Sequence, residues 1–267
     1  MIVKIIFLVF SLVGLINTEA RAQLFLEQGK LNLSVSGGEH TNGALMIHNT
    51  SSEQINIKVY WEDFEYKSPY DGTKEFLPAG TAPTSVSQWV TFSPQTFTLP
   101  AFGQQKIDYS VSVPDTIKEG HYGVLFFEKS SEATLGNSGV NLVTRVGCLF
   151  FVEPKDKNKN AVLQNVALKG DKVTVDFVNQ GNIILIPHST FYMMQDGGLV
   201  LLRGDAKKAY VPPGASATVE VPLKDKLKPG KYTLVVNSDL EEGDVVVKEI
   251  GLEVDASGQL TTVNTQE

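Results

Sequence analysis

Short alternations of hydrophobic and polar residues run along most of the chain after its first 22 positions. One covers residues 55–61 (INIKVYW), a second covers 107–113 (IDYSVSV) and a third covers 173–177 (VTVDF). A period of two places one face of a strand on a core and the other face in water. These stretches therefore predict half-buried β-strands.

About seven strands are predicted between Lys30 and Val152, and about seven more between Ala161 and Val254. Turns rich in Gly, Pro, Asn and Asp separate them, and no amphipathic helical pattern follows residue 22. Regularly spaced strands without helices are typical of antiparallel sandwiches. The predicted fold class is all-β, with two tandem immunoglobulin-like antiparallel β-sandwich domains after a cleaved signal peptide.

An internal repeat supports two similar domains. Residues 117–122 (IKEGHY) and 227–232 (LKPGKY) share the pattern [IL]-K-x-G-x-Y, and each copy follows an alternating strand that ends in Val-Pro. In a sandwich this corner leads into the penultimate strand, where a Tyr lays its ring on the core and bonds the backbone through its hydroxyl. We therefore interpret Tyr122 and Tyr232 as structural residues.

The first 22 residues have the three parts of a secretory signal. Lys4 gives the positive start, residues 5–16 (IIFLVFSLVGLI) form an apolar core, and residues 20–22 (ARA) give the small-x-small cleavage pattern. We expect cleavage before Gln23, with a retained N-terminal anchor as the alternative. No later stretch is apolar for long enough to span a membrane, so no membrane span is expected after cleavage.

The remaining length suggests two domains of ordinary size. We predict a signal peptide over residues 1–22, a first domain over 23–153, a second domain over 154–254 and a polar tail over 255–267. The polar run 155–160 (KDKNKN) is interpreted as a solvated linker or turn.

Charge and cysteine content narrow the classes of function. The chain has 30 acidic and 23 basic residues, a formal charge of −7, which argues against a nucleic-acid binder. Its single cysteine, Cys148, cannot form an internal disulfide. Because Cys148 lies in the apolar run VGCLFFV, we expect a buried, unreactive thiol.

No catalytic constellation is apparent. The chain has no P-loop, GxSxG, HExxH or GxGxxG motif, and its four histidines lack metal-ligand spacing. The densest acidic groups are residues 62–65 (EDFE) and 239–244 (DLEEGD), and the second lacks the ligand order of a calcium loop, so an acidic hairpin turn is the simpler interpretation. We expect no catalytic residue, no metal site and no cofactor, and therefore no enzyme.

Three further stretches are candidate contact regions. Residues 65–86 form a long connection rich in Pro, Gly and Thr, which predicts either a recognition loop or a plain surface loop. Residues 181–187 and 199–202 are apolar on both faces, which indicates a buried strand or an interface.

The first domain is similar to a known family. Residues 31–64, 89–114 and 120–128 resemble, in strand pattern and turn positions, the N-terminal immunoglobulin-like domain of periplasmic pilus-assembly chaperones. Residues 144–151 (TRVGCLFF) resemble the last strand of that domain, a TRIKLFYRP-like stretch. The resemblance covers residues 24–154, and the second domain resembles only generic immunoglobulin-like modules.

The resemblance implies a strand that is offered to a partner. In the family, the last strand of the first domain lends alternating apolar side chains to an incomplete pilus subunit by strand addition. The same face here carries Val140, Leu142, Thr144, Val146, Cys148 and Phe150. The candidate partner-binding residues are Lys30, Val140, Leu142, Thr144, Val146 and Phe150. The alternative is that this face fills the core of its own domain.

One departure from the family concerns its two cations, an Arg on the first strand and a Lys on the last, which grip the carboxylate of the subunit. By the TRIKLF alignment the Lys position falls on Gly147, and the first strand, residues 30–35, offers Lys30 but no Arg. A lone Lys lacks the forked geometry that holds a carboxylate. The resemblance therefore implies a divergent member without the paired clamp.

The leading hypothesis is a non-enzymatic periplasmic chaperone-like or scaffolding protein that binds another envelope or surface polypeptide, such as a fimbrial one, by strand-edge contacts. The alternative is a structural or adhesive surface module built of spacer domains, which would place the protein at the cell surface. The sequence leaves the client and the oligomeric state open.

Overall fold

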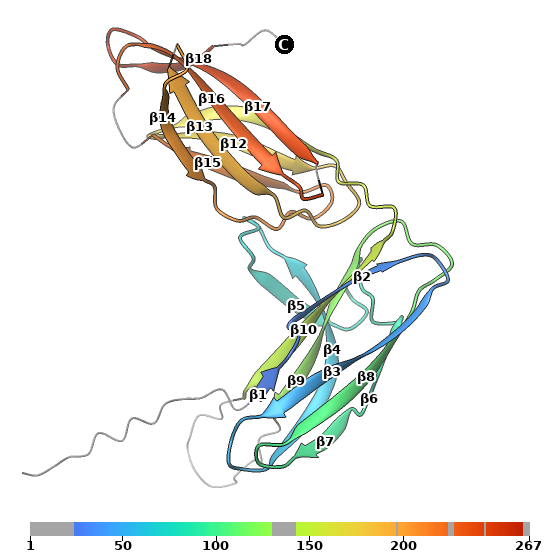
Figure 1. The fold of residues 1–267 in the computed structure, drawn as a ribbon. Coiled ribbons are helices and arrows are strands. Elements are labelled where there is room, and N and C mark those ends of the chain that lie inside the picture. Colours follow the sequence, from blue (N-terminus) through green and yellow to red (C-terminus); the bar gives the residue numbers. More distant parts are fainter. Residues whose placement is uncertain (1–23, 130–142, 196, 224–226, 243, 264–267) are drawn as a thin grey trace, which may run out of the picture.

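The chain is described by a computed structural model that covers residues 24–129, 143–195, 197–223, 227–242 and 244–263. Figure 1 shows two groups of strands, one below and one above a narrow joint. The described residues contain strands, turns and bends, and the predicted all-β fold class is confirmed. In this part of the chain no helix is long and apolar enough to cross a membrane. The predicted signal peptide, residues 1–22, lies outside the described residues.

The first sandwich consists of two sheets. In the first sheet the strand order is β1 (Leu24–Leu26), β3 (His40–Asn49), β8 (Gln104–Ser112) and β6 (Val90–Ser93). In the second sheet the order is β2 (Lys30–Val35), β10 (Arg145–Pro154), β9 (His121–Lys129), β4 (Ile55–Tyr66) and β5 (Lys74–Pro78), and β7 (Thr96–Leu99) also pairs with β4.

The second sandwich also consists of two sheets. A three-stranded sheet has the order β11 (Ala161–Lys169), β12 (Lys172–Asn179) and β15 (Ser216–Pro222). The facing sheet has the order β14 (Val200–Asp205), β13 (His188–Gln195), β16 (Gly230–Asp239), β17 (Val245–Val254) and β18 (Leu260–Val263). Strand β18 lies in the segment that we expect to be a polar tail, so part of that tail extends a sheet. The predicted domain boundaries stay predictions.

The alternating positions of the sequence build the two cores. Ile55, Ile57 and Val59 are buried in the first core, while Asn56 and Lys58 between them are exposed. In the second core Ala217, Val219 and Val221 of β15 are buried, while Thr218 and Glu220 between them are exposed. The period of two therefore identified the buried faces of these strands.

The first strand of the chain is divided between the two sheets of its sandwich. β1 pairs antiparallel with β3 in one sheet, and β2 pairs parallel with β10 in the other. Residues 27–29 make the crossing, and the Glu27 amide donates to the Met46 carbonyl just before the chain leaves the first sheet. As a result β2 meets β10 only from Leu149 onward.

The joint between the sandwiches is held by direct contacts. The Tyr122 hydroxyl accepts a hydrogen bond of 2.9 Å from the buried Ile184 amide, and the Gly120 amide donates to the Asn182 carbonyl at 2.9 Å. Nearby, the rings of Tyr66 and Tyr210 stack with centroids 4.8 Å apart. The second sandwich is thus fixed against one face of the sheet that contains β10.

The tyrosines of the two repeated corners form hydrogen bonds with different kinds of partner. The Tyr232 hydroxyl donates to the Lys228 carbonyl within its own corner at 2.6 Å, as the sequence predicts. The Tyr122 hydroxyl instead bonds the Ile184 amide of the other sandwich. Both tyrosines are structural, but one of them joins the two domains.

Part of the long connection over residues 65–86 is ordered by a buried carboxylate. β5 pairs with β4 within this stretch, and the following turn is pinned by Asp63, which is fully buried. The carboxylate of Asp63 accepts hydrogen bonds from the Thr81 amide at 2.9 Å, the Ala82 amide at 3.1 Å and the Ser85 hydroxyl at 2.8 Å. Unpaired buried charge is costly, so these donors are what allow a carboxylate at this position.

We predict that Asp63→Asn lowers the free energy of unfolding of the first sandwich by about 2–4 kcal/mol, because an amide NH₂ would face the donors that the carboxylate now accepts from. Both tryptophans, Trp61 and Trp89, belong to this sandwich, so denaturation followed by tryptophan fluorescence measures it. The control is Asp108→Asn, whose carboxyl pairs with Lys106 and is 67% exposed, and about 0.5 kcal/mol or less is expected there. Equal effects of the two variants would contradict the account.

We predict that Tyr122→Phe lowers the stability of the first sandwich by about 1–2 kcal/mol, since the buried Ile184 amide would lose its acceptor. In calorimetry the unfolding of the two sandwiches should then become less coupled. Tyr192→Phe serves as the control, because the Tyr192 hydroxyl has no hydrogen bond to the described residues. An unchanged unfolding profile for Tyr122→Phe would refute the role of this bond in the joint.

Candidate functional site

The candidate site is the first half of β10, where one edge of the strand is open. β9 pairs with β10 from Arg145 to Val152, whereas β2 covers the other edge only from Leu149 to Pro154. Among the described residues no strand pairs with the second edge between Arg145 and Cys148. We call this stretch, Arg145–Cys148, the open edge.

The direction of the backbone groups at the open edge follows from two hydrogen bonds. The Leu149 amide donates to the Gly29 carbonyl on the side of β2, and the Thr144 carbonyl accepts from the Lys129 amide on the side of β9. Because backbone groups alternate along a strand, the N–H and C=O of Arg145 and Gly147 point away from β9. Within the part of the chain that the structure describes, no strand bonds these outward groups.

The even-numbered side chains of β10 face the core. Cys148 and Phe150 are fully buried, and the ring of Phe150 packs edge-to-face with the rings of Trp61 and Tyr109. Burial raises the pKa of the Cys148 thiol to about 12, which leaves it protonated at neutral pH and agrees with the expected unreactive thiol. Of the predicted partner-binding residues, Phe150 is therefore a core residue.

The other predicted residues of this strand lie nearer to the open edge. Val146 is half-buried at the margin of the core, and Thr144 is partly exposed just before β10 begins. Val140 and Leu142 lie outside the described residues. The structure thus brings Thr144 and Val146 together at the open edge and separates them from Phe150.

The outer face of β10 carries a residue to which the sequence assigned no role. The Arg145 guanidinium lies over the ring of Phe126 at 4.0 Å and donates to the Tyr60 hydroxyl at 3.2 Å and to Glu62 at 3.1 Å. The hydrogen bond to Tyr60 raises the pKa of Arg145, and burial raises the pKa of Tyr60. Arg145 is thus held flat on the sheet, with its backbone left at the open edge. The sequence signal for it was a single charged residue within the otherwise uncharged stretch 144–151.

Gly147 has a packing reason to be glycine. A Cβ at this position would lie 2.8 Å from Val124 Cγ2 and 2.9 Å from Phe126 Cε1, closer than side chains tolerate. A Lys at this position, where the family alignment places one, would force the side chains of Val124 and Phe126 to shift. The register also sets Lys30 opposite Leu149 and not opposite Gly147.

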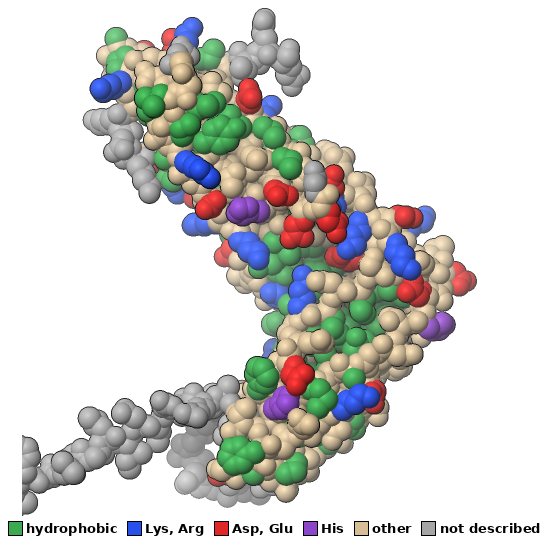
Figure 2. All heavy atoms as spheres, viewed as in Figure 1, with side chains coloured by type: hydrophobic (Ala, Val, Ile, Leu, Met, Phe, Trp, Pro, Cys, Tyr) green, Lys and Arg blue, Asp and Glu red, His purple; other side chains and the backbone are tan. Residues whose placement is uncertain are grey.

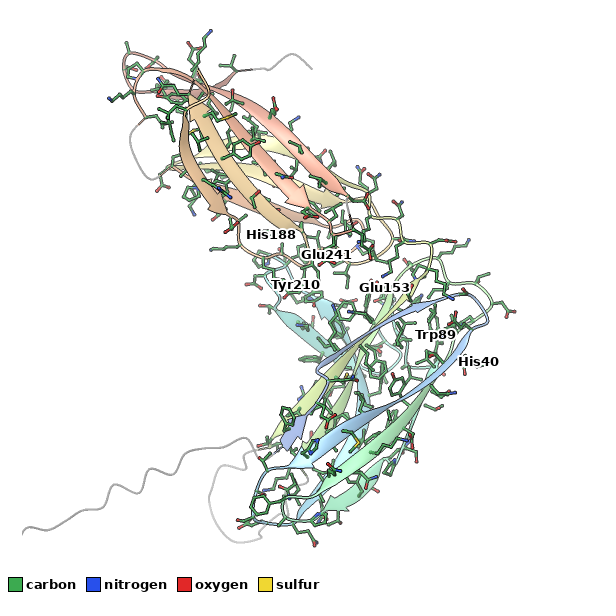
Figure 3. All side chains as sticks on the ribbon, viewed as in Figure 1. His40, Trp89, Glu153, His188, Tyr210 and Glu241 are labelled. Atoms are coloured by element: carbon green, nitrogen blue, oxygen red, sulfur yellow. The ribbon has the colours of Figure 1, made fainter. Side chains whose placement is uncertain are left out.

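Lys30 lies at the cleft between the two sandwiches. Its ammonium is 3.9 Å from the centre of the Phe151 ring, and burial lowers its pKa. Among the described residues no carboxylate forms an ion pair with it. The cleft beside it has a volume of about 370 Å³ and is lined also by Ile184, Ile186 and Glu241. Figure 2 shows hydrophobic, basic and acidic side chains together where the two sandwiches meet, and Figure 3 places Glu153 and Glu241 there.

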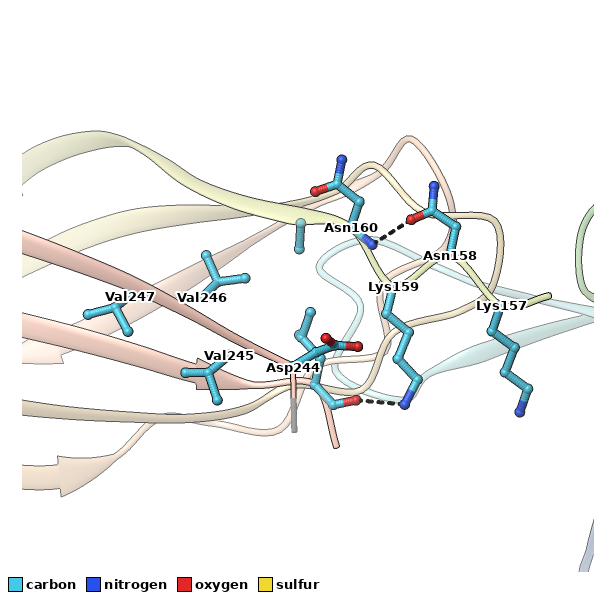
Figure 4. A pocket seen from close by; sticks show the side chains of 10 residues that line it. Lys157, Asn158, Lys159, Asn160, Asp244, Val245, Val246 and Val247 are labelled. Atoms are coloured by element: carbon cyan, nitrogen blue, oxygen red, sulfur yellow. Dashed lines mark hydrogen bonds between the residues drawn. The ribbon is translucent and has the colours of Figure 1, made fainter. Parts of the chain in front are cut away.

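A second, more polar hollow lies beside the linker. It has a volume of about 610 Å³ between residues 157–161 and residues 244–247, as Figure 4 shows. The Lys159 ammonium donates to the Leu240 carbonyl at 3.1 Å and pairs with Glu242 at 2.8 Å. Lys159 therefore binds two residues of the acidic stretch, Leu240 and Glu242. The described residues hold no group of three His, Cys, Asp or Glu suited to a metal.

The comparisons with known proteins concern the fold. No family model and no curated protein matches the chain. The class 5 fimbriae chaperone CfaA has a solved structure with a TM-score of 0.53 and 13% identity, over 85% of this chain and 98% of that one. A chain from the chaperone–tip adhesin complex of CFA/I fimbriae biogenesis has a TM-score of 0.53 and 14% identity, over 88% of this chain and 100% of that one. The chain has the fold of these fimbrial chaperones, as the resemblance implies.

We predict that Gly147→Ala lowers the free energy of unfolding of the first sandwich by about 1–3 kcal/mol, because the added methyl group overlaps Val124 and Phe126. The matched control is Gly29→Ala, where a Cβ would meet nothing within 4 Å. The free energy of unfolding of both variants is measured by denaturation followed by tryptophan fluorescence. If Gly147→Ala were as stable as Gly29→Ala, the packing explanation for the missing Lys would be wrong.

Proposed function

We propose that the protein is a non-enzymatic, chaperone-like or scaffolding protein of the bacterial periplasm, and that it binds an extended segment of another envelope or surface polypeptide. The observation that carries the proposal is the open edge of β10, where the backbone groups of Arg145 and Gly147 have no partner strand among the described residues. An added strand gains its affinity from such backbone groups and its specificity from side chains at alternate positions.

The surroundings of the open edge support this proposal. Val143 just before β10 is 49% exposed, and Val146 lies at the margin of the core. Both apolar side chains can pack against the side chains of an added strand. Arg145 is held on Phe126 by contacts with its own sheet, which keeps its side chain away from the edge. The fold is that of chaperones of fimbriae, which is consistent with a client of the same envelope class.

Lys30 supplies a second contact in the proposal. Its ammonium lies at the cleft, on the same sheet as the open edge, and packs on an aromatic ring instead of a carboxylate. A client strand at the open edge would approach the cleft along β10 and meet this cation. A single Lys gives a point charge without a fork, so we assign it a supporting contact and assign the main affinity to the backbone.

The client can be identified with tagged mature protein in the envelope fraction of its own host, by cross-linking and mass spectrometry. The expected result is a stoichiometric partner cross-linked near residues 143–148. A clean monomer, or only self-cross-links, would favour the alternative function of a structural spacer module.

We predict that Arg145→Pro lowers the affinity for the captured client by roughly tenfold or more. Proline removes the N–H that faces the open edge, while the hydrogen bonds from β10 to β9 remain. The matched control is Arg145→Ala, which removes the same side-chain contacts but keeps the N–H. Client affinity is measured for both variants, with circular dichroism as the check on folding. Equal affinity of the two variants would exclude strand addition at this edge.

A further inference from the structure

The second sandwich has an open edge of its own at β14. Among the described residues β14 pairs only with β13, and it forms one side of its sheet (Figure 1). Leu199, Val200 and Leu201 at its start are 63%, 51% and 45% exposed. An exposed edge with apolar residues is a template for pairing with another strand.

One hydrogen bond fixes which backbone groups of β14 are free. The Ala206 amide donates to the Ser189 carbonyl of β13 at 2.8 Å, and the register continues with Gly204 opposite Phe191. Because backbone groups alternate, Gly204 and Ala206 face β13, and the N–H and C=O groups of Arg203 and Asp205 face outward. The outward groups therefore belong to two residues of opposite charge.

This alternation restricts how two such edges can pair around a two-fold axis. Outward residues must lie opposite outward residues, so the axis passes through a residue of β14 and not between two residues. An axis at Arg203 sets two arginines opposite each other, and an axis at Asp205 sets two aspartates opposite each other. An axis at Gly204 sets Arg203 of each copy opposite Asp205 of the partner subunit, which gives two pairs of opposite charge. Opposite charges directly across two strands are stabilising, whereas like charges are destabilising.

We propose that the β14 edge binds the β14 edge of a second copy of this chain, antiparallel and centred on Gly204. The side chains are available for this contact. Arg203 and Asp205 are exposed, and Arg203 has no ion-pair partner among the described residues. Asp205 has only the long contact of 3.8 Å with His188, which Figure 3 labels on the neighbouring strand.

The apolar start of β14 fits the same pairing. With the axis at Gly204, Leu201 lies beyond the end of β14 of the partner subunit, since the strand ends at Asp205. The exposed apolar residues at the start of β14 are then at the margin of the shared edge. The shared edge is short, so the dimer is weak and its share of the protein rises with concentration. The two five-stranded sheets would join into one continuous sheet.

The dimer is independent of the proposed client site. The open edge of β10 belongs to the first sandwich, while β14 belongs to the second. A protein without a client could still dimerise, and a monomer could still bind a client. Failure of one proposal therefore leaves the other standing.

The test is sedimentation velocity of the mature protein over a range of concentrations, with charge-reversal variants. Wild-type protein should show a monomer–dimer equilibrium, and Arg203→Asp or Asp205→Arg should each weaken it by roughly tenfold, since each places like charges across the edge twice. The double variant that exchanges the two charges should restore association. Lys231→Asp, on an exposed residue of β16, is the control for net charge and should leave the equilibrium unchanged.

Three outcomes would overturn the proposal. The first is wild-type protein that stays monomeric at the highest soluble concentration. The second is a dimer that is insensitive to Arg203→Asp and Asp205→Arg, which would place the contact elsewhere. The third is a charge-exchanged double variant that remains as weak as the single variants while circular dichroism shows it folded, which would mean that the two residues do not face each other.

Discussion

The constraint on which the rest of this structure depends is the crossing of the first strand between two sheets. Hydrogen bonding of β1 to β3 keeps residues 24–26 in one sheet, and only after residues 27–29 does β2 reach β10 in the other. A strand cannot pair in both sheets at once, so among the described residues the first half of β10 has β9 as its single neighbour strand. The outward backbone groups of Arg145 and Gly147 follow from that crossing, and so does the proposed client site.

The contacts between the two sandwiches fix the position of the second sandwich relative to the sheet that carries the open edge. The hydroxyl of Tyr122 is bonded to the amide of Ile184, and the Tyr66 and Tyr210 rings stack beside it, so the second sandwich stands over the sheet that contains β10. The cleft with Lys30 lies on the same side. The proposed dimer uses the far sandwich, through Arg203 and Asp205. In this account each sandwich offers one of its sheet edges to a partner, and the two edges belong to different sandwiches.

Local pattern was enough to predict the strands, because alternation at residues such as Ile55, Ile57 and Val59 reports burial directly. The local pattern was also enough to predict the corner at Tyr232, because its hydroxyl bonds the Lys228 carbonyl only four residues away. Contacts between distant segments could not be predicted. The bond from Ile184 to Tyr122, the donors that satisfy Asp63 and the overlap of Gly147 with Phe126 all require the register of strands that are far apart in sequence. The sequence also left open whether the face of Phe150 serves a partner or the core of its own domain, and the structure buries Phe150 in that core.

The most direct test of the central claim is amide hydrogen exchange of the isolated, monomeric protein, resolved by residue along β10. The account predicts fast exchange for Arg145 and Gly147, whose N–H groups face the open edge, and slow exchange for Val146 and Cys148, whose N–H groups bond to β9. Upon client binding, Arg145 and Gly147 should become protected. Protection of Arg145 and Gly147 equal to that of Val146 in the free monomer would contradict it, because the edge would then already be paired.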